Sequence, residues 1–360
     1  MNHPAAQKSK LLHLEIMRIF AVYFVIFNHT SGSGYMLFTH VTPGSWRYWV
    51  YLILSIFCKV SVPLFLMISG ALLLKKDPER LDFLFRKRIL KMCILLFVVS
   101  LLYYLRDMML TPDSSYGIRN FFKTIYSDTT SRHLWYLYMY LAFLFILPFL
   151  QALVKNLKDE YFVYMILISF ATSCVTLMEL VLFHNHVTLN THFSFTWVPD
   201  IILYPCVGYY MENRLEITKK NTSLLGALNI ACLACSAFWT YYYMVHPSSD
   251  LKVGVATFHK RFVLINAISM FMLIKYLSQY LQITPRISKF LLSMGSCTFG
   301  IYLIHKAVMA SRYHNVVMDF LKRIIPGRML PCLVFCLVVL LISYLLTLIL
   351  KKIPIIKDYL

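Results

Sequence analysis

The stretch LLHLEIMRIFAVYFVIFNHTS, residues 11–31, indicates the fold class. A run of about 20 mostly apolar residues is long enough to cross the hydrocarbon core of a bilayer as a helix. Glu15 and Arg18 lie inside this run, and the apolar region of a cleaved signal peptide avoids such charges. We therefore expect a retained first membrane helix rather than a signal peptide.

The rest of the chain repeats this pattern. Of its 360 residues, 59% are hydrophobic and 14% are charged, whereas a soluble domain carries roughly 25% charged residues. We predict an all-α, polytopic integral membrane bundle of about ten helices in a single membrane-embedded domain over 1–360. A short surface helix is expected within the connection 107–132. The predicted spans are 11–31, 47–74, 87–106, 133–154, 161–183, 196–212, 222–245, 259–281, 291–311 and 329–350.

The basic excess fits a membrane topology. Lys and Arg number 35 against 16 Asp and Glu, but they fall largely between the apolar runs, so we expect no nucleic-acid partner. Most of them, including KKDPERLDFLFRKR at 75–88, lie on the same side as the N-terminus when the runs are counted as spans. Because cytoplasmic connections are enriched in Lys and Arg, both termini are predicted to be cytoplasmic in a multi-pass protein of the cell membrane. The basic connection 312–328 runs against this assignment.

Two polar groups share one face of the first span. Arg18 and His29 are eleven positions apart, which in an α-helix is about 20° more than three turns and about 16 Å along the axis. A charged side chain at a helix centre in the membrane costs about 2.5–3.5 kcal/mol, and such residues usually face the bundle interior. The spacing is typical of a path for a long substrate or a proton. Alternatively, Arg18 pairs with Glu15 or snorkels, and His29 only bonds a carbonyl group.

Further polar residues fall at related depths. Lys59 lies in the second span, and a lysine near Arg18 would favour an anion such as a phosphate. His133 and His305 are expected at the depth of His29, where a polar acceptor pocket served by a histidine base is a simpler interpretation than a three-histidine metal site. Trp135 stands in the aromatic segment HLWYLYMY at 133–140, which is typical of an interfacial belt and compatible with sugar stacking.

Four motifs in order carry a family resemblance: RIFAVYFVIFNH at 18–29, SVPLFLMISGALLL at 61–74, HLWYLYMYLAFLFILP at 133–148 and TFGIYLIH at 298–305. Together they resemble the acyltransferase 3 family, and in particular bacterial membrane O-acetyltransferases of surface polysaccharides. The resemblance implies transfer of an acetyl or other short acyl group from cytoplasmic acyl-CoA to a sugar hydroxyl of a cell-surface polysaccharide or its lipid-linked precursor. Acetyl-CoA would then be a donor substrate, with no tightly bound cofactor and no metal.

The resemblance also implies roles for single residues. Arg18 and His29 occupy the Arg-x10-His motif, which places both in the active site, with His29 as the general base. Arg18 and Lys59, the basic position before SVPLF, are expected to bind the donor. The resemblance gives no definite role to His133 or His305; from their depth and from the aromatic segment, His133, Trp135 and His305 are expected to contact the acceptor substrate.

Other functions fit the same features. A multi-span transporter or flippase of glycans or small anionic solutes would also need charges within the membrane and broken helices. The sequence shows no inverted repeat, which many such carriers contain. A non-catalytic partner of a glycan synthase is a third alternative.

Overall fold

The computed structural model describes residues 12–110, 116–183, 190, 198–246, 262–310 and 314–359. Its regular structure over these residues is entirely helical, which confirms the predicted class. The helices are α2 Leu12–Asn28, η1 Ser31–Ser33, η2 Leu37–His40, α3 Trp46–Phe57, η3 Cys58–Val60, α4 Ser61–Leu73, α5 Leu81–Leu84, η4 Phe85–Ile89, α6 Leu90–Leu110, α7 Ile118–Ser127, η5 Arg132–Leu134, α8 Trp135–Asn156, α9 Asp159–Phe183, α10 Asp200–Asn213, α11 Lys219–Val245, α13 Val263–Ser278, α14 Pro285–Ser296, α15 Thr298–Met309, α16 His314–Ile324, α17 Met329–Leu350 and α18 Pro354–Lys357.

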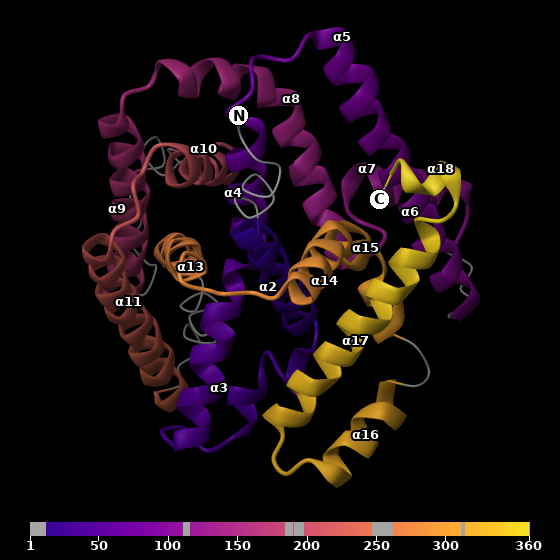
Figure 1. The fold of residues 1–360 in the computed structure, drawn as a ribbon. Coiled ribbons are helices and arrows are strands. Elements are labelled where there is room, and N and C mark those ends of the chain that lie inside the picture. The colour runs from indigo at the N-terminus through magenta and orange to yellow at the C-terminus, as the bar shows by residue number, and fades with distance from the viewer. Residues whose placement is uncertain are drawn as a thin grey trace.

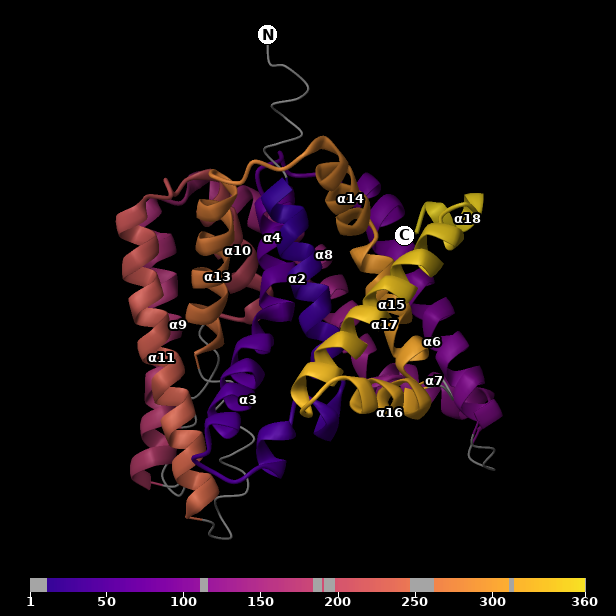
Figure 2. The ribbon, with the colours of Figure 1, turned by 60° about the horizontal axis from the view of Figure 1, so that its bottom comes forward.

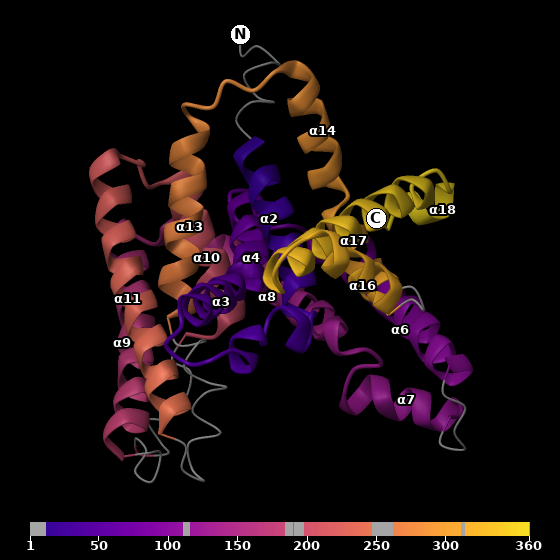
Figure 3. The same cartoon turned by 90° about the horizontal axis from the view of Figure 1, so that it is seen from below.

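Helix α2 lies at the centre of the bundle. It packs against α4, α13, α14, α15 and α17, and nine of its residues are buried. Figures 1 and 2 show α9 and α11 side by side on one flank, and α6, α7 and α18 on the opposite flank. In Figure 3, α13 stands between the α9–α11 flank and the central helices. The first span is therefore the helix around which the other helices are arranged.

Within the described residues, each of the ten predicted spans overlaps one helix or two to three consecutive helices. Residues 11, 196–197, 259–261 and 311 of these spans lie outside the described part of the chain. Six helical segments of the described chain are long and apolar enough to cross a membrane, and the bent pair α14–α15 would be a seventh. The remaining three predicted spans correspond to α2, α10 and α13, which have 17, 14 and 16 residues. The count of ten and the cytoplasmic termini remain predictions. The surface helix expected in the connection 107–132 is α7.

Two of the predicted spans are interrupted close to residues of the candidate site. The second span changes from α3 to α4 through the 3-10 turn η3, which carries Lys59. Pro63 follows in the first turn of α4, where a missing backbone N–H removes no intrahelical bond. Between α14 and α15 the axis bends by 67° at Cys297.

Helices α4 and α10 approach each other closely because glycines face backbone. A Cβ atom on Gly70 would lie 1.9 Å from the carbonyl oxygen of Pro205, and one on Gly208 would lie 2.0 Å from that of Met67. Small residues at membrane helix contacts allow such backbone approach. Gly70 therefore serves helix packing, whereas the interruption of this span lies upstream, in η3.

This contact leads to a stability prediction. We expect Gly208→Ala to lower the stability of the folded protein by about 1–3 kcal/mol, because the added methyl group meets backbone that cannot move aside. The matched control is Gly226→Ala on α11, where an added Cβ has nothing within 4 Å and the change should be neutral or favourable by up to about 1 kcal/mol. Thermal unfolding of the purified variants in detergent measures both. Equal unfolding midpoints for the two variants would contradict the packing argument.

Candidate active site

Three histidines from three separate segments meet inside the bundle. His29 follows α2, His133 lies in η5 and His305 lies in α15. The ring centroid of His29 is 6.3 Å from that of His133 and 5.3 Å from that of His305, and the last two are 5.2 Å apart. His133 and His305 are almost completely buried. The structure thus brings together the three imidazoles that the sequence placed at a similar depth.

The hydrogen bonds of His305 fix its tautomer. Its Nδ1 lies 2.6 Å from the backbone carbonyl oxygen of Tyr302. Because a carbonyl oxygen only accepts hydrogen bonds, Nδ1 carries the proton and the neutral ring exposes an unprotonated Nε2. This buried Nε2 has no hydrogen-bond partner among the described residues. A buried imidazole nitrogen of this kind can accept a proton or a hydrogen bond from a neighbouring group.

His133 is held from several sides. Its Nδ1 lies 3.0 Å from Ser131 Oγ, and its Nε2 lies 3.4 Å from the carbonyl oxygen of Leu303. The hydroxyl of Tyr302 donates to the carbonyl oxygen of His133 itself, and Tyr103 donates to Leu303 at 2.9 Å. The bonds of His133 to Leu303 and of Tyr302 to His133 join η5 to α15, and the bond of Tyr103 joins α6 to α15. Together they hold His133 and His305 at a fixed separation.

A cavity of about 790 Å³ adjoins the histidines and is called here the histidine cavity. His29, His133, Trp135 and Lys59 line it, so four of the sequence-predicted site residues share one space. Trp135 has 46% of its surface exposed and remains available for contact with a ligand. The other residues that line the histidine cavity are Val25, Asn28, Ser61, Val62, Pro63, Leu66, Tyr136, Met139, Ser169, Thr172, Ser173, Thr176, Val198, Asp200, Leu203, Tyr204, Val263, Leu264 and Tyr302.

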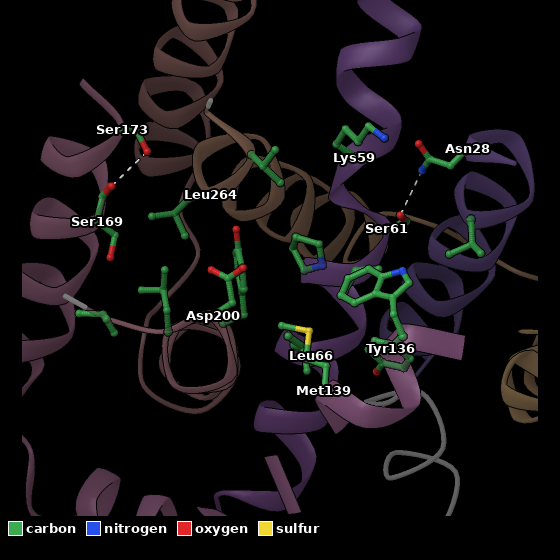
Figure 4. A pocket seen from close by; sticks show the side chains of 18 of the residues that line it. Asn28, Lys59, Ser61, Leu66, Tyr136, Met139, Ser169, Ser173, Asp200 and Leu264 are labelled. Carbon is green, nitrogen blue, oxygen red and sulfur yellow. Dashed lines mark hydrogen bonds between the residues drawn. The ribbon is translucent and has the colours of Figure 1, made fainter. Parts of the chain in front are cut away.

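Lys59 reaches this cavity from the turn η3. The turn is tied to the end of α2, because Asn28 Nδ2 donates to the carbonyl oxygen of Cys58 at 3.0 Å and to Ser61 Oγ at 3.4 Å. The ammonium group of Lys59 lies 3.9 Å from the ring centroid of Tyr35, a cation–π contact. Figure 4 shows Lys59, Asn28 and Ser61 on the same side of the cavity.

Arg18 lines a second, smaller cavity of about 280 Å³, called here the Arg18 cavity. Its Nη1 donates to Glu15 Oε1 at 2.6 Å, which is the pairing that the sequence left open. The arginine side chain is still 26% exposed. Ser69, Tyr140 and Ser296 are among the polar residues of the same cavity. Pairing with Glu15 and contact with a ligand are therefore compatible.

Tyr136 and Tyr302 line both cavities. Their rings meet edge to face with centroids 5.5 Å apart, so this pair forms a shared wall between Arg18 on one side and the histidines on the other. The structure does not bring Arg18 and Lys59 together, because they line different cavities. The geometry does not support the sequence expectation that both cations build one phosphate site. Donor binding by each residue stays a prediction.

Several residues that line the cavities were not predicted from the sequence. The hydroxyl residues Ser169, Thr172, Ser173 and Thr176 recur at steps of three and one, a spacing that places them on one helix face. Tyr136 and Tyr302 stand inside the quoted motifs but carried no assigned role. Among the described residues, no group of three His, Cys, Asp or Glu side chains is arranged to hold a metal ion.

Comparison with known proteins agrees with the quoted motifs. The chain matches the family model described as an acyltransferase domain, acyltransferase 3, over residues 11–349. The match extends from the first residues of the central span to the penultimate residue of α17 and includes every residue of both cavities. No match is found among curated proteins or among solved structures.

Proposed function

Because the chain belongs to the acyltransferase 3 family, we propose that it transfers an acetyl or other short acyl group from acyl-CoA to a sugar hydroxyl of a cell-surface polysaccharide or its lipid-linked precursor. The observation that carries this proposal is the pair of cavities with a common wall. One cavity offers a guanidinium group, and the other offers the imidazoles of His29 and His133 in the lining of a space of about 790 Å³, with His305 packed next to them.

The histidine cavity supplies the chemistry of acyl transfer. His29 removes the proton from the acceptor hydroxyl while that oxygen attacks the thioester carbonyl carbon. The new C–O ester bond forms, the C–S bond breaks, and the CoA sulfur leaves with the proton from His29. A positioned base of this kind contributes about 10²–10⁴ in rate. His305, whose ring centroid is 5.3 Å from that of His29, is fully buried outside the cavity lining and packs against this base rather than against the acceptor. His133 lines the cavity beside His29.

Positive charge in the two cavities serves two stages of the reaction. In this proposal Arg18 binds a phosphate or an amide oxygen of the donor, and the acyl-bearing arm extends past Tyr136 and Tyr302 toward His29. Lys59 shares the cavity of His29 and stabilises the negative charge that develops on the thioester oxygen. Charge stabilisation in a water-poor site is usually a large part of catalysis.

The proposal predicts transfer without transport. We expect purified protein in nanodiscs to move label from [¹⁴C]acetyl-CoA to de-O-acetylated surface polysaccharide as a base-labile ester. Label should stay with CoA in nanodiscs that lack the protein. Proteoliposomes that take up the polysaccharide while consuming no acetyl-CoA would contradict the proposal and favour the carrier.

A further inference from the structure

One wall of the histidine cavity is made of hydroxyl groups from α9. Ser169, Thr172, Ser173 and Thr176 all line the cavity, whereas the same helix presents large exposed apolar side chains elsewhere, namely Val163, Leu167, Met178 and Leu182. Figure 4 shows Ser169 and Ser173 on the side of the cavity opposite Asn28, Ser61 and Tyr136. A helix with an exposed apolar face therefore turns its hydroxyls toward the cavity.

The hydrogen atoms of these hydroxyls are largely engaged within α9. Thr172 donates to the carbonyl oxygen of Ile168 at 2.9 Å, Ser173 to that of Ser169 at 3.1 Å, and Thr176 to that of Thr172 at 3.1 Å. Ser169 Oγ is buried and has no partner among the described residues. Since a hydroxyl that donates keeps its lone pairs, three of these oxygens are left as acceptors toward the cavity.

The other walls complete a set suited to a polyhydroxylated ring. Asp200 begins α10 and adds a carboxylate, which Figure 4 shows between the α9 hydroxyls and the opposite wall. Trp135 adds a flat apolar surface, and Lys59 adds a donor. An acceptor-rich wall and an aromatic ring in the same cavity fit a molecule with many O–H donors and one C–H face. The cavity volume of about 790 Å³ lies within the usual range for small-molecule sites.

We propose that this wall is the acceptor subsite: a sugar ring lies between the α9 hydroxyls and Trp135, donates to Ser173, Thr176 and Asp200, and presents one hydroxyl to His29. This inference rests on the proposed function and adds the residues that recognise the acceptor. An alkyl alcohol, as the alternative occupant, has a single O–H donor and would leave most of these acceptors unused.

Binding without the donor tests the subsite. The probes are four methyl glycosides (of glucose, galactose, rhamnose and N-acetylglucosamine) and octanol, each followed by saturation-transfer NMR with the full-length protein in nanodiscs. We expect at least one glycoside to bind, and Thr172→Val/Ser173→Ala/Thr176→Val to raise its Kd at least tenfold. The triple variant removes two of the acceptors named in the proposal, Ser173 and Thr176, together with the neighbouring Thr172 hydroxyl, and the loss of two hydrogen bonds suffices for this change. Asp200→Asn is a second, single variant and should also weaken binding.

The matched control is Thr240→Val. Thr240 donates to the backbone of its own helix α11, as the α9 hydroxyls do, but it does not line the cavity, so glycoside affinity should stay at the wild-type value. Wild-type affinity in both the triple variant and Asp200→Asn would overturn the subsite, as would binding of octanol with none of the glycosides. Acetyl-CoA consumption, measured separately, reports on the proposed function, so the failure of either idea is recognisable.

Discussion

His29→Ala is expected to reduce acyl transfer to the acceptor by about 10²–10⁴-fold, because the acceptor hydroxyl loses its proton acceptor. The variant should still insert and accumulate, since His29 lies after the end of α2 and beside an open cavity, so a methyl group leaves the helix contacts in place. Steady-state rates with labelled acetyl-CoA measure kcat, and quantitative blotting of membranes measures accumulation.

A histidine away from the cavities provides the control. His246 directly follows α11, with its Nδ1 3.0 Å from the carbonyl oxygen of Tyr242, and it lines neither cavity. His246→Ala should therefore transfer at the wild-type rate. Transfer by His29→Ala within a factor of about three of the wild type would remove His29 from the mechanism.

The second large effect is expected at Arg18. Arg18→Gln alone leaves the buried carboxylate of Glu15 without its cation, which destabilises a protein by itself. The informative variant is therefore Arg18→Gln/Glu15→Gln, which removes both charges. A hydrogen bond to a charged group contributes about 1.5–3 kcal/mol, so we expect its KM for acetyl-CoA to rise about 10- to 100-fold, with kcat and the KM for the acceptor nearly unchanged.

Glu15→Gln alone separates the two roles of Arg18. If Arg18 binds the donor, this variant keeps the guanidinium in the Arg18 cavity and should keep a KM for acetyl-CoA close to the wild-type value. A rise in KM equal to that of the double variant would show that the ion pair itself, at 2.6 Å, is what the site requires. In the double variant Arg18→Gln/Glu15→Gln, a fall in kcat with an unchanged KM for acetyl-CoA would also contradict donor binding by Arg18.

The helices were predictable from the sequence because apolar runs of membrane length leave few alternatives. The ends of the helices were less predictable where charged residues lie within a helix. The third span was expected from residue 87, but the helical segment begins at Leu81. Arg88 is accommodated there by a paired contact with Glu79, at 2.6 and 2.5 Å. The residues that the prediction left out, 81–86, include Asp82 and Arg86, and hydropathy assigns such charged residues to a connection.

The candidate site was predictable one helix at a time. The spacing of Arg18 and His29 follows from helix geometry, and both residues do line cavities. The contact among His29, His133 and His305 joins segments more than a hundred residues apart in the chain, which spacing within one helix cannot reveal. The α9 hydroxyls were missed because Ser and Thr are ordinary in membrane helices, where their hydroxyls bond the preceding turn. A count of hydroxyls per helix face would have identified them.

The central claim is that a donor held at Arg18 and an acceptor held at the histidine cavity react across the bundle. Proteoliposomes with uniformly oriented protein test it most directly, with acetyl-CoA supplied to one face and acceptor glycan to the other. The account predicts acetylated glycan when acetyl-CoA is on the face where α2 begins and the glycan is on the opposite face, and none in the reverse arrangement. Product formation only when both substrates share one face would contradict it.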